Sequence, residues 1–227
     1  MPFQGLSWFR LREHIRKLGW IYIVGTLSCL MLTNLLYTST RPRIPPEQSV
    51  LVYLMDAYAD TERLEPLSAE ALEAAQREDP LLEEVKFEWL QFNDPETDYT
   101  SGMLLMTRMA LGEGDVYVTS SYGLESLIGS GLCRPLDDDL AAGWLDGLDL
   151  EPVPVTDAET GETFIGALKL DNVTALSELQ IFNNHGAYLI MASNSTNGVA
   201  SRAAVDYMLR TLMEGNYAPA ESTEPTA

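Results

Sequence analysis

The sequence predicts an α/β protein: a single domain with a mostly parallel sheet of about five strands and helices on both faces, preceded by one transmembrane helix. Three observations carry this prediction. Residues 18–37 form an uncharged apolar segment. The chain after it alternates short apolar runs with helical segments, the pattern of strands joined by helical crossovers. Almost all acidic residues fall in this second part.

The apolar segment LGWIYIVGTLSCLMLTNLLY, residues 18–37, has the length of a membrane-spanning helix, for which about 20 residues are needed. Trp20 and Tyr37 suit the two membrane interfaces. We interpret it as a signal anchor that stays in the lipid bilayer. A cleaved signal peptide is the alternative, but residues 37–40, YTST, are a poor cleavage site. A buried helix of a soluble protein would have the same composition.

Charge divides the chain sharply. Residues 1–43 hold six of the 14 Lys and Arg residues but one of the 34 Asp and Glu residues. The basic segment 1–17 before the span predicts a cytoplasmic N-terminus, so the protein is expected in the cell membrane with its C-terminal domain extracytoplasmic. The remaining chain carries eight basic and 33 acidic residues. Such a surface repels phosphate backbones, which excludes nucleic acid as a partner and favours cationic ligands or a basic partner.

Beyond the span, residues 38–48 are rich in proline and predict an extended stalk. Residues 49–215 form the predicted domain, and residues 216–227 a disordered tail. Apolar runs predict five strands, at residues 49–55, 84–92, 115–119, 163–170 and 187–192. The segment 84–92 alternates apolar and polar residues, which is typical of a half-exposed edge strand.

Helical segments lie between these strands. They are predicted at residues 69–78, capped by Ser68, and at 100–111, 122–129 and 201–214. Ser120 or Ser121 is expected to cap the third of these helices. The methionines of the second helix, Met103, Met106 and Met109, are interpreted as core filler. The acidic stretch 137–162 is predicted to be mainly loop.

The inventory of reactive side chains argues against an enzyme. The predicted domain has one histidine, His185, so a Ser-His-Asp triad or a histidine metal site is not expected. Cys29 lies inside the apolar segment and Cys133 far outside it, so no disulfide is predicted. Asp137, Asp138 and Asp139 lack the spacing of a calcium loop. We therefore expect no catalytic residues, no metal and no cofactor.

A ligand of a parallel sheet binds beyond the carboxyl ends of its strands, where loops and helix N-termini meet. This rule nominates the residues that follow the first and third strands. They are Asp56, Tyr58, Ser120, Ser121 and Tyr122. Ordinary capping and turn formation would explain the same residues, Ser121 above all.

One stretch resembles a known family. In MTRMALGEGDVYVTSSYGLESLIGSGLCRPLDD, the spacing A-x-G-x-x-D-V from Ala110 to Val116, followed by P-L-D at residues 135–137, is similar to a segment of the solute-binding proteins of ABC importers. Residues 164–170, FIGALKL, and 188–214 are similar to later parts of that family. The resemblance extends over most of residues 50–215.

The resemblance implies a bacterial, periplasmic-binding-protein-like lobe that acts in solute binding or transport, with a permease as a possible neighbour. Members of that family build a second lobe after the P-L-D segment, whereas only about 26 residues, 137–162, intervene here. The chain therefore resembles one lobe without its partner lobe. Two functions follow as hypotheses: capture of a small-molecule ligand, or docking to another membrane protein without any small-molecule ligand.

Overall fold

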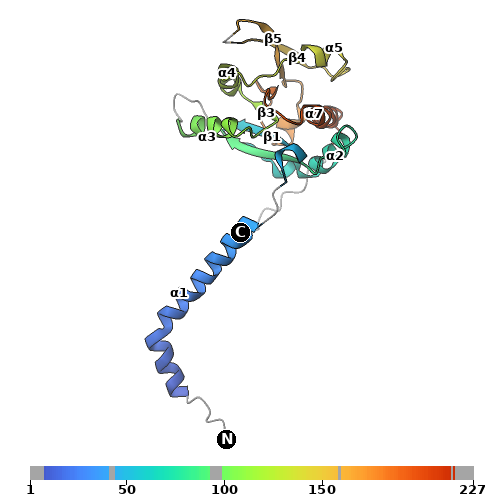
Figure 1. Cartoon of the computed structure of the whole chain (residues 1–227). Coiled ribbons are helices and arrows are strands. Elements are labelled where there is room, and N and C mark those ends of the chain that lie inside the picture. Colours follow the sequence, from blue (N-terminus) through green and yellow to red (C-terminus); the bar gives the residue numbers. More distant parts are fainter. Residues whose placement is uncertain (1–7, 41–43, 93–98, 158–159, 216, 218–227) are drawn as a thin grey trace. The chain divides into compact units, whose positions relative to one another are not determined.

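The structure is a computed structural model that describes residues 8–40, 44–92, 99–157, 160–215 and 217. It divides into two compact units, residues 1–43 and 44–227. In the first unit, α1 is one continuous helix, Trp8–Thr40 (Figure 1). Its apolar part, Gly19–Tyr37, is long enough to cross a membrane. The predicted span is thus present as a helix, while Arg41 and Arg43 of the predicted stalk lie outside the described residues.

The second unit is built on one six-stranded sheet with the order β2-β1-β3-β6-β5-β4. The strands are β1 (Ser49–Asp56), β2 (Glu84–Gln91), β3 (Val116–Thr119), β4 (Glu151–Thr156), β5 (Thr163–Lys169) and β6 (Tyr188–Met191). β1 is parallel to both β2 and β3, whereas β6 is antiparallel to its neighbours and β4 is antiparallel to β5. The sheet is therefore mixed, with its parallel half at β2-β1-β3.

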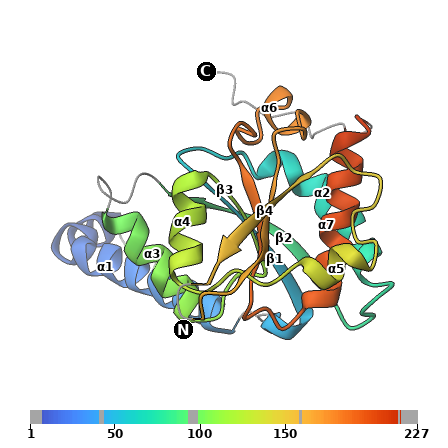
Figure 2. The same cartoon turned by 90° about the horizontal axis from the view of Figure 1, so that it is seen from above.

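Helices cover both faces of this sheet, as predicted. They are α2 (Glu65–Ala75), α3 (Tyr99–Ala110), α4 (Ser121–Gly129), α5 (Asp137–Ala141), α6 (Ala175–Glu178) and α7 (Gly198–Met213), with short 3-10 turns at Pro46–Gln48 and Glu62–Leu64. Figure 2 shows α3 and α4 on one side of the sheet and α2 and α7 on the other.

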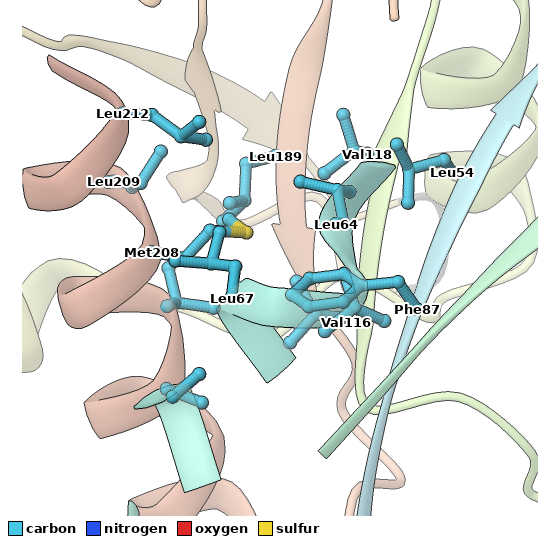
Figure 3. Packing of buried hydrophobic residues seen from close by; sticks show 14 of the residues in the cluster. Leu54, Leu64, Leu67, Phe87, Val116, Val118, Leu189, Met208, Leu209 and Leu212 are labelled. Carbon is cyan, nitrogen blue, oxygen red and sulfur yellow. The ribbon is translucent and has the colours of Figure 1, made fainter. Parts of the chain in front are cut away.

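The α2 and α7 face encloses the larger core. Leu67 of α2 and Leu209 of α7 are fully buried against sheet residues that include Leu54 and Leu189 (Figure 3). Alternation along β1 explains this face, because Val50, Val52 and Leu54 point to it while the residues between them point away.

The α3 and α4 face encloses a smaller core that contains two buried tyrosines. Tyr53 of β1 and Tyr117 of β3 stack with their ring centroids 5.6 Å apart. Leu105 of α3 and Leu127 of α4 pack in the same cluster. Cys133 is also buried there without a disulfide, and burial raises the pKa of its thiol to about 11.

Several predictions at element boundaries were wrong. The prediction of five strands missed β4, because Pro152 and Pro154 suggest a loop; prolines are tolerated here because β4 is an edge strand. α2 begins at Glu65, so Ser68 lies within its first turn, where its hydroxyl donates to the Glu65 carbonyl over 2.6 Å. The predicted tail, residues 216–227, lies outside the described residues except for Tyr217.

Candidate functional site

The parallel half of the sheet brings two of the five predicted ligand residues together. Met55 of β1 pairs with Thr119 of β3, so the next residues, Asp56 and Ser120, leave the sheet side by side at its carboxyl edge. Tyr58 follows in the loop after β1. Ser121 begins α4. The pairing of β1 with β3 therefore brings Asp56 and Ser120 close together, and a role in binding stays a prediction.

Asp56 makes hydrogen bonds that connect the ends of β1 and β2. Its carboxylate accepts a hydrogen bond from the Ala57 amide over 2.7 Å. Its backbone carbonyl accepts two more, from the Trp89 indole over 3.1 Å and from the Phe92 amide over 3.2 Å. Trp89 lies on β2 with 44% of its surface exposed. These bonds tie the end of β2 to the end of β1.

The remaining predicted residues are exposed. Tyr58 and Tyr122 are each more than half exposed, and Ser121 is exposed as well. Ser120, one of the two residues expected to cap this helix, occupies the cap position of α4 but makes no side-chain cap bond, and Ser121 is the first residue of the helix. Together with Asp56 they form an open rim. Three hollows of the described surface, of about 290, 340 and 370 Å³, are lined by other residues.

A second exposed surface lies on α3, where the sequence predicted core filler. Tyr99, Met103, Met106 and Ala110 follow one another at intervals of four, three and four residues, so they share one face of the helix. All four are exposed: Tyr99 by 77%, Met103 by 53% and Met106 by 70%. The interpretation of Met103 and Met106 as core filler is therefore wrong.

A neighbouring row of α3 extends this surface. Leu104 and Leu111, which follows the helix directly, are both exposed. We call the six residues the α3 apolar face: Tyr99, Met103, Leu104, Met106, Ala110 and Leu111. The opposite side of the helix is buried through Ser101 and Leu105. Thr100 and Thr107, which are also exposed, lie between the two rows, so this side of the helix carries two hydroxyl side chains as well.

The single charged residue of α3 does not interrupt the apolar face. The Arg108 guanidinium donates to the Glu113 carboxylate over 2.5 Å and to the Tyr53 hydroxyl over 3.3 Å, while its side chain stays 36% exposed. It also lies 6.0 Å from the centre of the Tyr53 ring. Burial raises the pKa of Tyr53 to about 12, against the opposing effect of Arg108.

Comparison of the chain with known protein families, with curated proteins and with solved structures found no match. The structure does, however, give a physical role to the aspartate of the family-like motif. Asp115 is buried, and its carboxylate accepts hydrogen bonds from the Leu51 amide over 2.8 Å and from the Ser195 hydroxyl over 2.5 Å. Desolvation raises the pKa of Asp115, and these two hydrogen bonds oppose the rise.

The same network reaches the start of the domain. The Asn197 amide group donates to the carbonyls of Pro46 and Ser49 over 2.6 and 2.7 Å. The Asn197 backbone in turn donates to the Ser195 hydroxyl over 3.2 Å. Asp115, Ser195 and Asn197 therefore fasten the loop before α7 to the first residues of β1. These contacts indicate a structural role for the three residues.

Two aspartates of the acidic run in α5 also make ion pairs or hydrogen bonds within the domain. The Asp139 carboxylate is buried between the guanidinium groups of Arg134, 2.7 Å away, and Arg202. The Asp137 carboxylate accepts the Ile165 amide over 3.0 Å. Among the residues that the structure describes, no group of three or more His, Cys, Asp or Glu side chains is placed to hold a metal ion.

Proposed function

We propose that this protein is a membrane-anchored, non-enzymatic docking domain, and that the α3 apolar face is the surface on which it binds another membrane protein. One observation carries the proposal. A domain of strongly acidic composition exposes Tyr99, Met103, Met106 and their apolar neighbours on one helix, whose one charged residue, Arg108, is paired with Glu113. Clustered exposed apolar side chains of this kind mark interaction sites in soluble domains.

The composition of the surface suits a protein partner. Methionine and tyrosine are enriched in interface cores, and methionine adapts its shape to the surface that it meets. The open rim at the carboxyl edge, with Tyr58, Trp89 and Tyr122 exposed, adds aromatic side chains of the type that dominate binding energy at interfaces.

Capture of a solute is the second candidate, and it rests on the family resemblance. Enclosure of a ligand would need a facing wall. Residues 137–162 do not form a second lobe, since their regular elements are α5 and the edge strand β4. The resemblance is therefore best taken as ancestry, with docking as the present activity.

The anchor and its orientation complete the proposal. The Gly19–Tyr37 segment of α1 inserts in the cell membrane. The basic residues that precede it place the N-terminus in the cytoplasm and residues 44–227 outside. A permease is one candidate partner, because the resembled family works beside permeases.

Site-specific photo-crosslinking of the full chain in its native membrane tests the proposal. A photoreactive residue at Met106 is expected to give one discrete adduct with an integral membrane protein. The matched control is Val199 on α7, which is 51% exposed and lies on the opposite face of the sheet. Introducing Met103→Lys beside the probe should abolish the adduct. The same adduct from Val199, or none from Met106, would overturn the proposal.

Thermal unfolding distinguishes solute capture from docking. The full chain in detergent micelles would be heated with sugars, amino acids, peptides, polyamines and divalent metals. A ligand at about 100 times its dissociation constant stabilises the folded state by about 2.7 kcal/mol. We expect no such shift. A shift that disappears in Asp56→Ala or Tyr122→Ala would instead establish solute capture at the carboxyl edge.

A further inference from the structure

The two edges of the sheet are constructed differently. At one edge, β4 contains Pro152 and Pro154, and its pairing with β5 is irregular between Val153 and Pro154. Prolines and bulges prevent a further strand from pairing with an edge. At the other edge, β2 contains no proline, and all eight of its residues pair with β1 in unbroken register. The β2 edge therefore lacks the features that block β4.

The backbone of β2 is available for pairing on its outer side. Leu51 of β1 directs its amide and carbonyl to Asp115 on the β3 side, so Val50, Val52, Leu54 and Asp56 face β2, and the Asp56 carbonyl accepts the Phe92 amide over 3.2 Å. Because Asp56 pairs with Gln91 in unbroken register and successive residues alternate, the backbone groups of Val85, Phe87 and Trp89 are directed outward. No described strand lies on that side of β2.

A hollow lies alongside this edge. It has a volume of about 290 Å³ and is bounded by β2 and by the segment that leads into α2. Its lining residues are Thr61, Glu62, Glu65, Ser68, Glu84, Val85, Lys86 and Phe87. The hollow is thus a groove between an unpaired strand edge and the first turn of a helix.

The groove is acidic. The carboxylates of Glu62, Glu65 and Glu84 make no ion pair with any described residue. Lys86, the one cation of the lining, lies 2.5 Å from the Glu88 carboxylate, which offsets its charge. Arg63 is directed away, to Asp60 and the Leu179 carbonyl.

We propose that the outer edge of β2 binds an extended, basic segment of another protein by strand addition. The backbone of that segment would pair with the outward groups of Val85, Phe87 and Trp89. Its alternate side chains would lie on the face of β2 that packs on α2, above Glu62 and Glu65. Lys or Arg at these alternate positions matches the groove in charge. This inference is independent of the α3 apolar face.

A labelled peptide of alternating valine and lysine is a suitable probe, added to the full chain in detergent micelles and followed by fluorescence anisotropy. We expect saturable binding that weakens with added salt. A valine and glutamate peptide should not bind, nor should the lysine peptide with alternate backbone amides methylated. Absence of binding at millimolar peptide, or equal binding of the acidic peptide, would overturn the proposal.

Two variants test the geometry. Trp89→Pro removes an outward amide without removing a backbone bond to β1 and should abolish binding, whereas Trp89→Ala should keep it. The triple change Glu62→Gln, Glu65→Gln and Glu84→Gln should leave the fold intact and weaken binding about tenfold. Met106→Gln should bind like the unchanged chain. Full binding by folded Trp89→Pro, or by the triple variant, would refute strand addition in the acidic groove.

Discussion

The two faces of the sheet differ in how completely they are closed. Among the described residues, the cluster under α2 and α7 contains 30 buried apolar side chains, and the cluster under α3 and α4 contains 14. α7 buries seven residues along its length, whereas α3 buries two. The comparison suggests that one face supplies the stability of the domain and leaves the other free to present exposed apolar side chains.

The largest effect is expected from truncating the closed face. Leu209 is fully buried in the α7 helix, so Leu209→Ala leaves a cavity between α7 and the sheet. Such a change costs about 3 kcal/mol. Urea unfolding of the full chain in detergent micelles measures it. A cost below about 1 kcal/mol would mean that the α2 and α7 face is not the main source of stability.

The second largest loss of stability is expected in the network of Asp115, Ser195 and Asn197, which joins the sheet to the loop before α7. Asp115→Ala leaves the Leu51 amide and the Ser195 hydroxyl without their shared acceptor, which costs about 2 kcal/mol. Ser195→Ala, which removes one of the two bonds, should cost less in the same unfolding assay. Equal costs would show that the Leu51 bond contributes little.

Asp115 also gives a pH dependence with a defined sign. Its pKa is raised in the folded state, so the folded protein binds the proton more tightly than the unfolded chain does. The contribution of Asp115 to stability is therefore full below its ordinary pKa of 3.8 and declines as pH rises through the folded value. Unfolding measured from acid to neutral pH should show this decline in the unchanged protein and not in Asp115→Asn.

The buried tyrosines of the open face predict an alkaline transition. The Tyr53 pKa rises from 10.0 to about 12 on folding, so stability should fall as pH increases from 10 toward 12. The slope from one such group is at most about 1.4 kcal/mol per pH unit. Tyr53→Phe should make the slope shallower in unfolding series at alkaline pH. An unchanged slope would mean that Tyr53 is accessible to water.

The smallest effect on stability is expected at the α3 apolar face. Met106 is mostly exposed, so Met106→Gln should change the free energy of unfolding by less than about 0.5 kcal/mol. With the photoreactive residue placed at Met103 instead, the same variant should lose the crosslinked partner, because a polar side chain would then be buried in the interface. A large loss of stability would show that this helix face is packed within the protein.

Local patterns predicted most of the elements. Alternation located β2 as a half-exposed edge strand, and continuous apolar runs located β1 and β6 as buried strands. Asp56 and Ser120 were predicted only as residues that follow the first and third strands, and the pairing of β1 with β3 brings them together. Predictions failed where a local signal has two meanings: proline marks both loops and edge strands, as Pro152 shows, and methionine occurs in both cores and exposed interfaces.

The sequence by itself determined the apolar helix, the division of charge, the α/β class and the approximate position of most strands, because each follows from composition or from the period of nearby residues. The tertiary structure decided which residues of α3 are exposed, which edge of the sheet is open and which partners the buried carboxylate of Asp115 has. These depend on contacts between segments distant in sequence. The sequence of α3 does not indicate which side of the helix packs on the sheet, because apolar residues occur on more than one of its sides.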